Sequence, residues 1–130
     1  MSFMVEVYSS DVSLLTDFHP TIKPLARVAT APAEVLDAAS LDLDLATLVG
    51  EVFRIAASFG ELGGAISAVD ALVGLMQRRK KTGVTTTAEV VVDGTKITFS
   101  GDLTPEQLAD RVQRARDAFA AAAGASPGPP

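Results

Sequence analysis

An unbroken apolar heptad pattern runs through residues 44–79 and limits what this chain can fold into. Apolar residues recur there at alternating spacings of three and four, at Leu45, Leu48, Val52, Ile55, Phe59, Leu62, Ile66, Val69, Val73 and Met76. Such a series predicts a helix that packs against other structure along its whole length. One straight helix of this extent would be ~52 Å long at about 1.5 Å per residue, beyond the size of a small domain. Part of its apolar face would then need cover from another chain.

Glycines interrupt this segment at positions 50, 60, 63 and 64. Each glycine inside a helix costs about 0.5–1 kcal/mol relative to alanine, so each needs a structural reason. Either the helix breaks near residues 60–64 into a hairpin of two helices, or small residues there let a second helix approach closely. The small residues of that contact would be Gly60, Gly63, Ala65, Ser67 and Ala68. The continuous heptad phase favours one helix, kinked at most.

Charged residues argue against a membrane span in this segment. A span requires about 20 predominantly apolar residues, whereas Glu51, Arg54, Glu61 and Asp70 interrupt the series. The segment ends in "RRKK", residues 78–81, and cations in a last helical turn complement the helix dipole. Binding to an anionic partner is the alternative interpretation, and attachment to a membrane surface through the helix and these cations is a weaker one.

The N-terminal part of the chain predicts short, alternating elements. Residues 3–8, "FMVEVY", alternate around Glu6 and are rich in strand formers. Residues 12–18 predict a short helix, which His19-Pro20 and Pro24 limit. A second strand is expected over residues 25–30, "LARVAT", and a short helix over residues 32–39, which begin with proline.

The C-terminal part carries two well-defined local signals. Asp93-Gly94 lies between β-branched segments and predicts a hairpin over residues 86–100, because a type I′ turn needs positive φ at both central residues. Thr104, Pro105 and Gln107 then form the capping box of a last helix. Its apolar stripe comprises Leu108, Val112, Ala115 and Phe119.

These elements predict an α+β domain with the order β-α-β-α-β-β-α. Its small mixed sheet has about four strands, including the hairpin, and carries the long glycine-containing amphipathic helix and the capped C-terminal helix. Residues 1–120 are expected to form a single domain. The tail over residues 121–130, "AAAGASPGPP", has no apolar pattern and is expected to be disordered.

The residue types that carry most enzymatic chemistry are scarce. The chain has no cysteine, and His19 is its single histidine. A metal site or a nucleophilic triad is therefore not supported, and the glycines match no phosphate-binding loop. A net charge of −5 argues against nucleic-acid binding. We therefore expect no catalytic residue, cofactor or metal. No signal-peptide pattern begins the chain, so we expect a cytoplasmic location.

The order of these features resembles a known family. A glycine- and alanine-rich helical segment runs into "VGLMQRRK", and "AEVVVDGTKITFSG" and a leucine-containing helix follow. Together with the early strand and "LARVAT", this resembles the effector-associated constant component domains of actinobacterial conflict systems over roughly residues 3–119. Family members often carry tryptophan where this chain has Leu75. The resemblance implies a small non-enzymatic domain that couples variable effectors, such as peptidases, to a shared immune or signalling core.

The sequence therefore predicts a protein-interaction adaptor that self-associates or docks an effector protein. The expected interface comprises Leu48, Val52, Ile55, Phe59, Leu62, Ile66, Val69, Val73 and Met76. Phe59 is the best single anchor, since large apolar residues dominate binding energy. The alternative is a small-ligand-binding domain with an apolar pocket between sheet and helix, lined by Phe53, Phe59 and Phe99.

Overall fold

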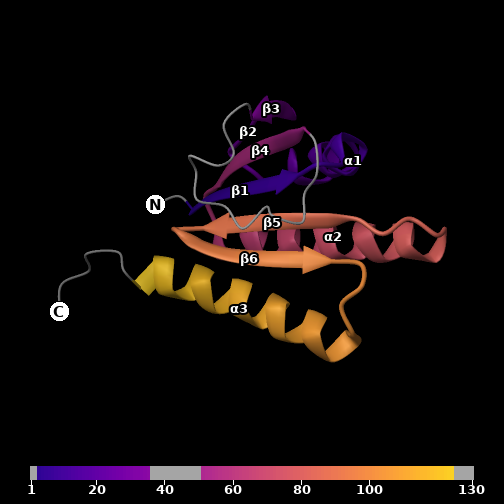
Figure 1. Ribbon diagram of the computed structural model, residues 1–130. Helices are drawn as coiled ribbons and strands as arrows, with labels where there is room; N and C mark the ends of the chain where they lie inside the picture. Colours follow the sequence, from indigo (N-terminus) through magenta and orange to yellow (C-terminus); the bar gives the residue numbers. More distant parts are fainter. Residues whose placement is uncertain (1–2, 36–50, 125–130) are drawn as a thin grey trace.

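The computed structural model describes residues 3–35 and 51–124. Within these residues, six strands form one antiparallel sheet, and three helices cover one of its faces (Figure 1). The elements are β1 (Phe3–Ser9), α1 (Val12–Ile22), β2 (Val28–Ala29), β3 (Ala33–Val35), β4 (Val52–Phe59), α2 (Leu62–Lys81), β5 (Thr87–Val92), β6 (Thr95–Ser100) and α3 (Pro105–Gly124). The strand order is β2-β4-β1-β5-β6, and β3 also pairs with β4. The predicted α+β class is confirmed, with more strands than expected.

The prediction of a single long helix over residues 44–79 is wrong, because residues 52–59 form strand β4. In a strand, alternate side chains share a face, so Ile55 and Phe59 point toward the helices while Val52 points to the opposite side. Only the spacing of four from Ile55 to Phe59 coincides with strand periodicity, whereas the spacing of three from Val52 to Ile55 does not. Gly60 follows the strand and α2 begins at Leu62. The alternative hairpin of two helices has its break at the right place, but its first half is a strand.

Three further boundaries differ from the sequence predictions. Residues 33–35 form β3 where a helix over 32–39 was expected, and the rest of that helix lies outside the described residues. Strand 25–30 shortens to β2. Helix α1 continues through Pro20 to Ile22, because Phe18 and Ile22 are both buried in the core and hold its last turns.

At the C-terminus, α3 runs to Gly124, beyond the domain boundary expected at residue 120. Its buried Ala115 and Phe119 tie the second half of the helix to the core. Residues 125–130 of the expected tail lie outside the described residues.

Both local signals in the C-terminal part are confirmed. Asp93 and Gly94 have φ values of 47° and 82° and connect β5 to β6, with Val92 opposite Thr95. At α3, the Gln107 N–H donates to the Thr104 hydroxyl at 3.1 Å, and the Thr104 N–H donates to the Gln107 side-chain oxygen at 3.0 Å. These two reciprocal bonds are the predicted capping box.

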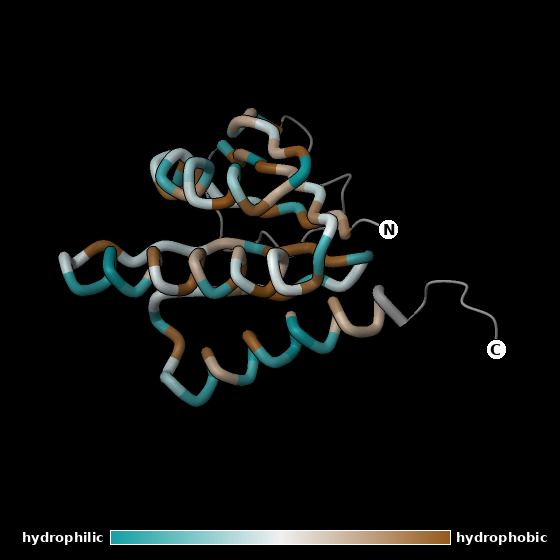
Figure 2. Tube along the Cα trace, turned by 180° about the vertical axis from the view of Figure 1, so that it is seen from behind, coloured by the Kyte–Doolittle hydropathy of each residue, from teal (hydrophilic) through white to brown (hydrophobic). Residues whose placement is uncertain are grey.

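The core lies between the sheet and the three helices. Side chains of β1, β4, β5 and β6 that point toward the helices meet the buried face of α2, which comprises Ala65, Ala68, Val69, Leu72 and Met76. Seen from the helix side in Figure 2, hydrophobic and hydrophilic positions alternate along α2 and α3. Each of these helices therefore has one apolar face turned inward.

The burial of Phe59 gives a direct test of this arrangement. Phe59→Ala is expected to lower the free energy of unfolding by about 3–5 kcal/mol, because it leaves a cavity in the core. Met4→Ala serves as the control, since Met4 is 54% exposed on the opposite face of the sheet, and its effect should stay within about 0.5 kcal/mol. Urea unfolding followed by circular dichroism measures both. Equal, small effects would show that the Phe59 ring is not a core group.

Candidate functional site

The residues predicted as an interface are mostly core residues. Five of them are buried within this chain's own fold: Val52, Ile55, Phe59, Val69 and Met76. Leu62, Ile66 and Val73 are partly buried and pack against the core, and Leu48 lies outside the described residues. These eight residues therefore pack within this chain's own fold and do not form one continuous exposed surface. Leu48 stays a prediction.

Helix α2 has a different face toward solvent, where two glycines and a serine lie beside the exposed side chain of Asp70, which pairs with Arg116 of α3. Ser67 follows Gly63 by four residues and Gly74 follows Gly63 by eleven, about one and three turns, so the three residues share one side of the helix. We call Gly63, Ser67 and Gly74 the small-residue face. Ala65 and Ala68, which the sequence analysis grouped with them, point instead into the core. The same helical period would have identified Gly74 from the sequence.

Internal packing explains the glycines at one end of α2 but not those of the small-residue face. A Cβ atom at Gly60 would lie 2.8 Å from the Arg27 side chain, and one at Gly64 would lie 3.2 Å from the Leu25 carbonyl oxygen. A Cβ atom at Gly63 or Gly74 would meet nothing within 4 Å. Gly74 lies in the helix interior, where glycine costs about 0.5–1 kcal/mol relative to alanine. No contact among the described residues offsets that cost.

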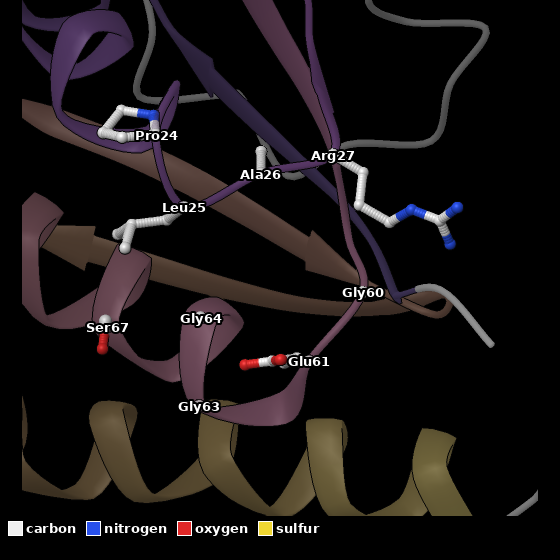
Figure 3. Close-up of a pocket in the computed structure, with 9 residues that line it drawn as sticks. All are labelled: Pro24, Leu25, Ala26, Arg27, Gly60, Glu61, Gly63, Gly64 and Ser67. Atoms are coloured by element: carbon white, nitrogen blue, oxygen red, sulfur yellow. The ribbon is translucent and has the colours of Figure 1, made fainter.

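A hollow of about 620 Å³ adjoins the small-residue face at the first turn of α2 (Figure 3). One wall is formed by residues 24–27 and the other by the glycines at 60, 63 and 64 with Glu61 and Ser67. Glu61 precedes the first turn, and its side chain makes no capping hydrogen bond. In Figure 3 the Glu61 carboxylate is directed toward this turn, whereas Arg27 points away from it. The hollow is open and has a carboxylate at its edge.

The opposite end of α2 is strongly basic. Arg79 is the inward-facing member of the "RRKK" group: its guanidinium contacts Asp17 at 2.5 Å, the Ser13 hydroxyl at 3.0 Å and Asp11 at 3.5 Å. These contacts fasten α2 to the start of α1. Arg78, Lys80 and Lys81 are exposed and make no ion pair with any residue of 3–35 or 51–124. The sequence interpretation of this group as a helix terminus therefore accounts for its position but leaves three charges without partners.

Asp11 contacts Arg79 and is also the N-cap residue of α1. Burial raises the pKa of its carboxyl, but hydrogen bonds from the Ser13 hydroxyl and the Leu14 N–H, with the charge of Arg79, outweigh burial. The pKa of Asp11 is therefore lowered in the folded chain. A group with a lowered folded pKa stabilises the fold above its unfolded pKa, and this contribution is lost as the pH falls through the folded value.

The residues that were considered for chemistry do not come together. No group of three or more possible metal ligands occurs among the described residues, and His19 lies half-buried on α1. The described residues do not form the expected apolar pocket: Phe59 and Phe99 are buried in the core, and Phe53 is partly buried against it. The space that α1 and α2 enclose with the sheet has a volume of about 10 Å³. Ligand pockets typically have roughly 300–1,000 Å³.

Comparisons with known proteins add no relative. The chain matches no protein-family model, no curated protein and no solved structure. Among the described residues, none of the helices has the length and apolar character that crossing a membrane requires. The features of the described residues that bear on function are the small-residue face, the hollow and the basic end of α2.

The glycines of α2 give a matched pair of stability predictions. Gly74→Ala is expected to raise the free energy of unfolding by about 0.5–1 kcal/mol, because the helix gains propensity and the methyl group meets nothing. Gly64→Ala should gain less or lose stability, because its Cβ presses on the Leu25 carbonyl. Urea unfolding of both variants measures the difference. Equal increases in the free energy of unfolding would contradict the close contact between a Cβ atom at Gly64 and the Leu25 carbonyl.

The pKa of Asp11 gives a pH-dependent prediction. Asp11→Asn keeps a good helix-capping residue but removes the charge, and at pH 7 it should lower the free energy of unfolding by about 0.3–1 kcal/mol. This deficit should shrink as the pH falls below about 4, the ordinary range for aspartate, because the wild-type carboxyl then becomes neutral as well. Unfolding curves at several pH values measure it. A deficit that is constant down to acid pH would contradict the charge interaction.

Proposed function

We propose that this chain is a non-enzymatic protein-interaction domain that pairs with a second copy of itself through the small-residue face of α2. In this role it serves as an adaptor for an effector protein in a bacterial conflict or signalling system, as the family resemblance implies. The observation that carries the proposal is Gly74. It lies inside a solvent-facing helix, costs stability, and has no internal packing reason. Close approach of another backbone supplies such a reason.

A second copy can pair with this face about a twofold axis. Consider two α2 helices that cross antiparallel about a twofold axis midway between Ser67 and Gly74. Ser67 then lies opposite Gly74 of the second copy, and Asp70, which pairs with Arg116 of α3, lies next to the axis. The same axis places Gly63 opposite Arg78 of the second copy. An interface of this kind is isologous, with every contact made twice.

The hollow and two exposed charged side chains, Arg78 and Glu61, fit the same antiparallel arrangement. Arg78 has no ion-pair partner among the described residues, and Glu61 makes no capping bond. In the antiparallel pair, the long Arg78 side chain of one copy extends over Gly63 into the hollow beside Glu61 of the other. Charge complementarity of this type favours one partner and one register. The helix dipoles are also antiparallel, which brings opposite partial charges together.

A charge exchange tests the register directly. Glu61→Lys and Arg78→Glu should each weaken self-association by more than about tenfold, because each places like charges opposite one another. The double variant Glu61→Lys/Arg78→Glu should restore it, since both ion pairs reform with reversed sign. Size-exclusion chromatography with light scattering over a wide concentration range measures the mass. Both positions are exposed, so folding should be retained, and circular dichroism checks this.

Two further variants test whether self-association needs close approach of the helices at Gly74, independently of the charged residues. Gly74→Leu should give a folded monomer, because leucine favours the helix but blocks close approach. Ala120→Leu, an equivalent change at an exposed position of α3, should associate as the wild type does. A wild-type chain that is monomeric at all concentrations would contradict self-association. A double charge variant that stays dissociated would contradict the antiparallel register.

A further inference from the structure

A second surface of α2, on the side next to α3, combines an apolar groove with cations. The groove has a volume of about 90 Å³ and lies where the last turns of α2 meet the loop after β6 and the start of α3. Its apolar lining includes Val73, Met76, Leu103 and Leu108. This volume equals that of about three water molecules, which is the size of one branched aliphatic side chain.

Cations border this groove on the α2 side. Lys80 is itself a lining residue, as is Gln77. Lys81 follows Gln77 by four residues, so it lies one turn further along the same side of the helix. Both lysines are exposed, and neither makes an ion pair with the part of the chain that the structure describes. A carboxylate that approaches here meets two lysines that form no competing ion pair within the described fold.

The walls of the groove are fixed by local hydrogen bonds. At the end of α2, Gly83 has a φ of 88°, its N–H donates to the Lys80 carbonyl, and the Val84 N–H donates to the Arg79 carbonyl. This pair of bonds is a Schellman motif, which satisfies the last carbonyls of the helix. On the other wall, the capping box of Thr104 and Gln107 fixes the start of α3. A groove with such walls loses little conformational freedom on binding.

We propose that this groove binds a short acidic peptide segment of another protein. One branched apolar side chain fills the groove, and neighbouring carboxylates contact Lys80 and Lys81. A peptide fits better than a polyanion, because the apolar lining of Val73, Met76, Leu103 and Leu108 accepts an apolar side chain, which a phosphate backbone does not carry. The proposal goes beyond self-association, since it uses the groove between α2 and α3 and a different partner.

Fluorescence anisotropy with a defined probe tests this site on the full chain. The probe is a labelled peptide of sequence Asp-Glu-Leu-Asp-Glu, and its control has glycine in place of leucine. The leucine peptide should bind more than about tenfold more tightly, because one side chain leaves water for the groove. Lys80→Glu should weaken its binding by about tenfold. The matched control, Lys23→Glu, changes an exposed cation after α1 and should leave binding unchanged.

Several outcomes would overturn the proposal. Equal binding of the leucine and glycine peptides, or an equal loss in Lys80→Glu and Lys23→Glu, would show nonspecific attraction between charges. No binding of either peptide would exclude the site. Binding to phosphatidylserine vesicles that is lost in Lys80→Glu, without peptide binding, would assign the cations to a lipid surface. The Gly74→Leu variant separates the two proposals, because it should abolish self-association and keep peptide binding.

Discussion

The antiparallel pairing of β1 with β4 is the interaction on which the rest of the structure depends. It extends over seven residue pairs, from Phe3 opposite Phe59 to Ser9 opposite Phe53. This ladder satisfies the backbone groups of β4 on one side, and β2 and β3 pair with its other side. Once residues 52–59 are extended, the chain has to leave the sheet at Gly60 and begin α2 at Leu62. The position of α2 on the sheet follows from that.

The neighbours of α2 then decide which of its faces is available. Its apolar face lies on the sheet, Arg79 fastens it to α1, and Asp70 contacts Arg116 of α3 at 3.5 Å. Figure 1 shows α2 over the middle of the sheet. The side left to solvent is therefore narrow, and it carries Gly63, Ser67 and Gly74 beside Asp70. Because two of these residues have no side chain, the helix backbone is accessible along this side.

The two proposed surfaces use one helix in different ways. On the small-residue face, shape dominates, since close approach of two backbones creates the contact area and a single ion pair per side sets the register. At the groove, one apolar side chain supplies most of the binding energy and the lysines select the sign of the partner's charge. Such a division lets one small domain associate with itself and also bind a different protein. Both surfaces depend on the helix ends: Glu61 at the first turn, and Arg78, Lys80 and Lys81 at the last.

Local chemistry in the sequence determined the β5–β6 hairpin, the cap of α3 and the α+β class, because an Asp-Gly turn or a capping box involves residues that are neighbours in the chain. The sequence also indicated a change near residues 60–64 through its glycines. It did not determine that residues 52–59 are a strand, since Ile55 and Phe59, four residues apart, share a face in a helix and in a strand alike. Only the tertiary structure decided this, because the partner that completes their hydrogen bonds, β1, lies some fifty residues away. The same pairing buried the expected interface and left the small-residue face of α2 in its place.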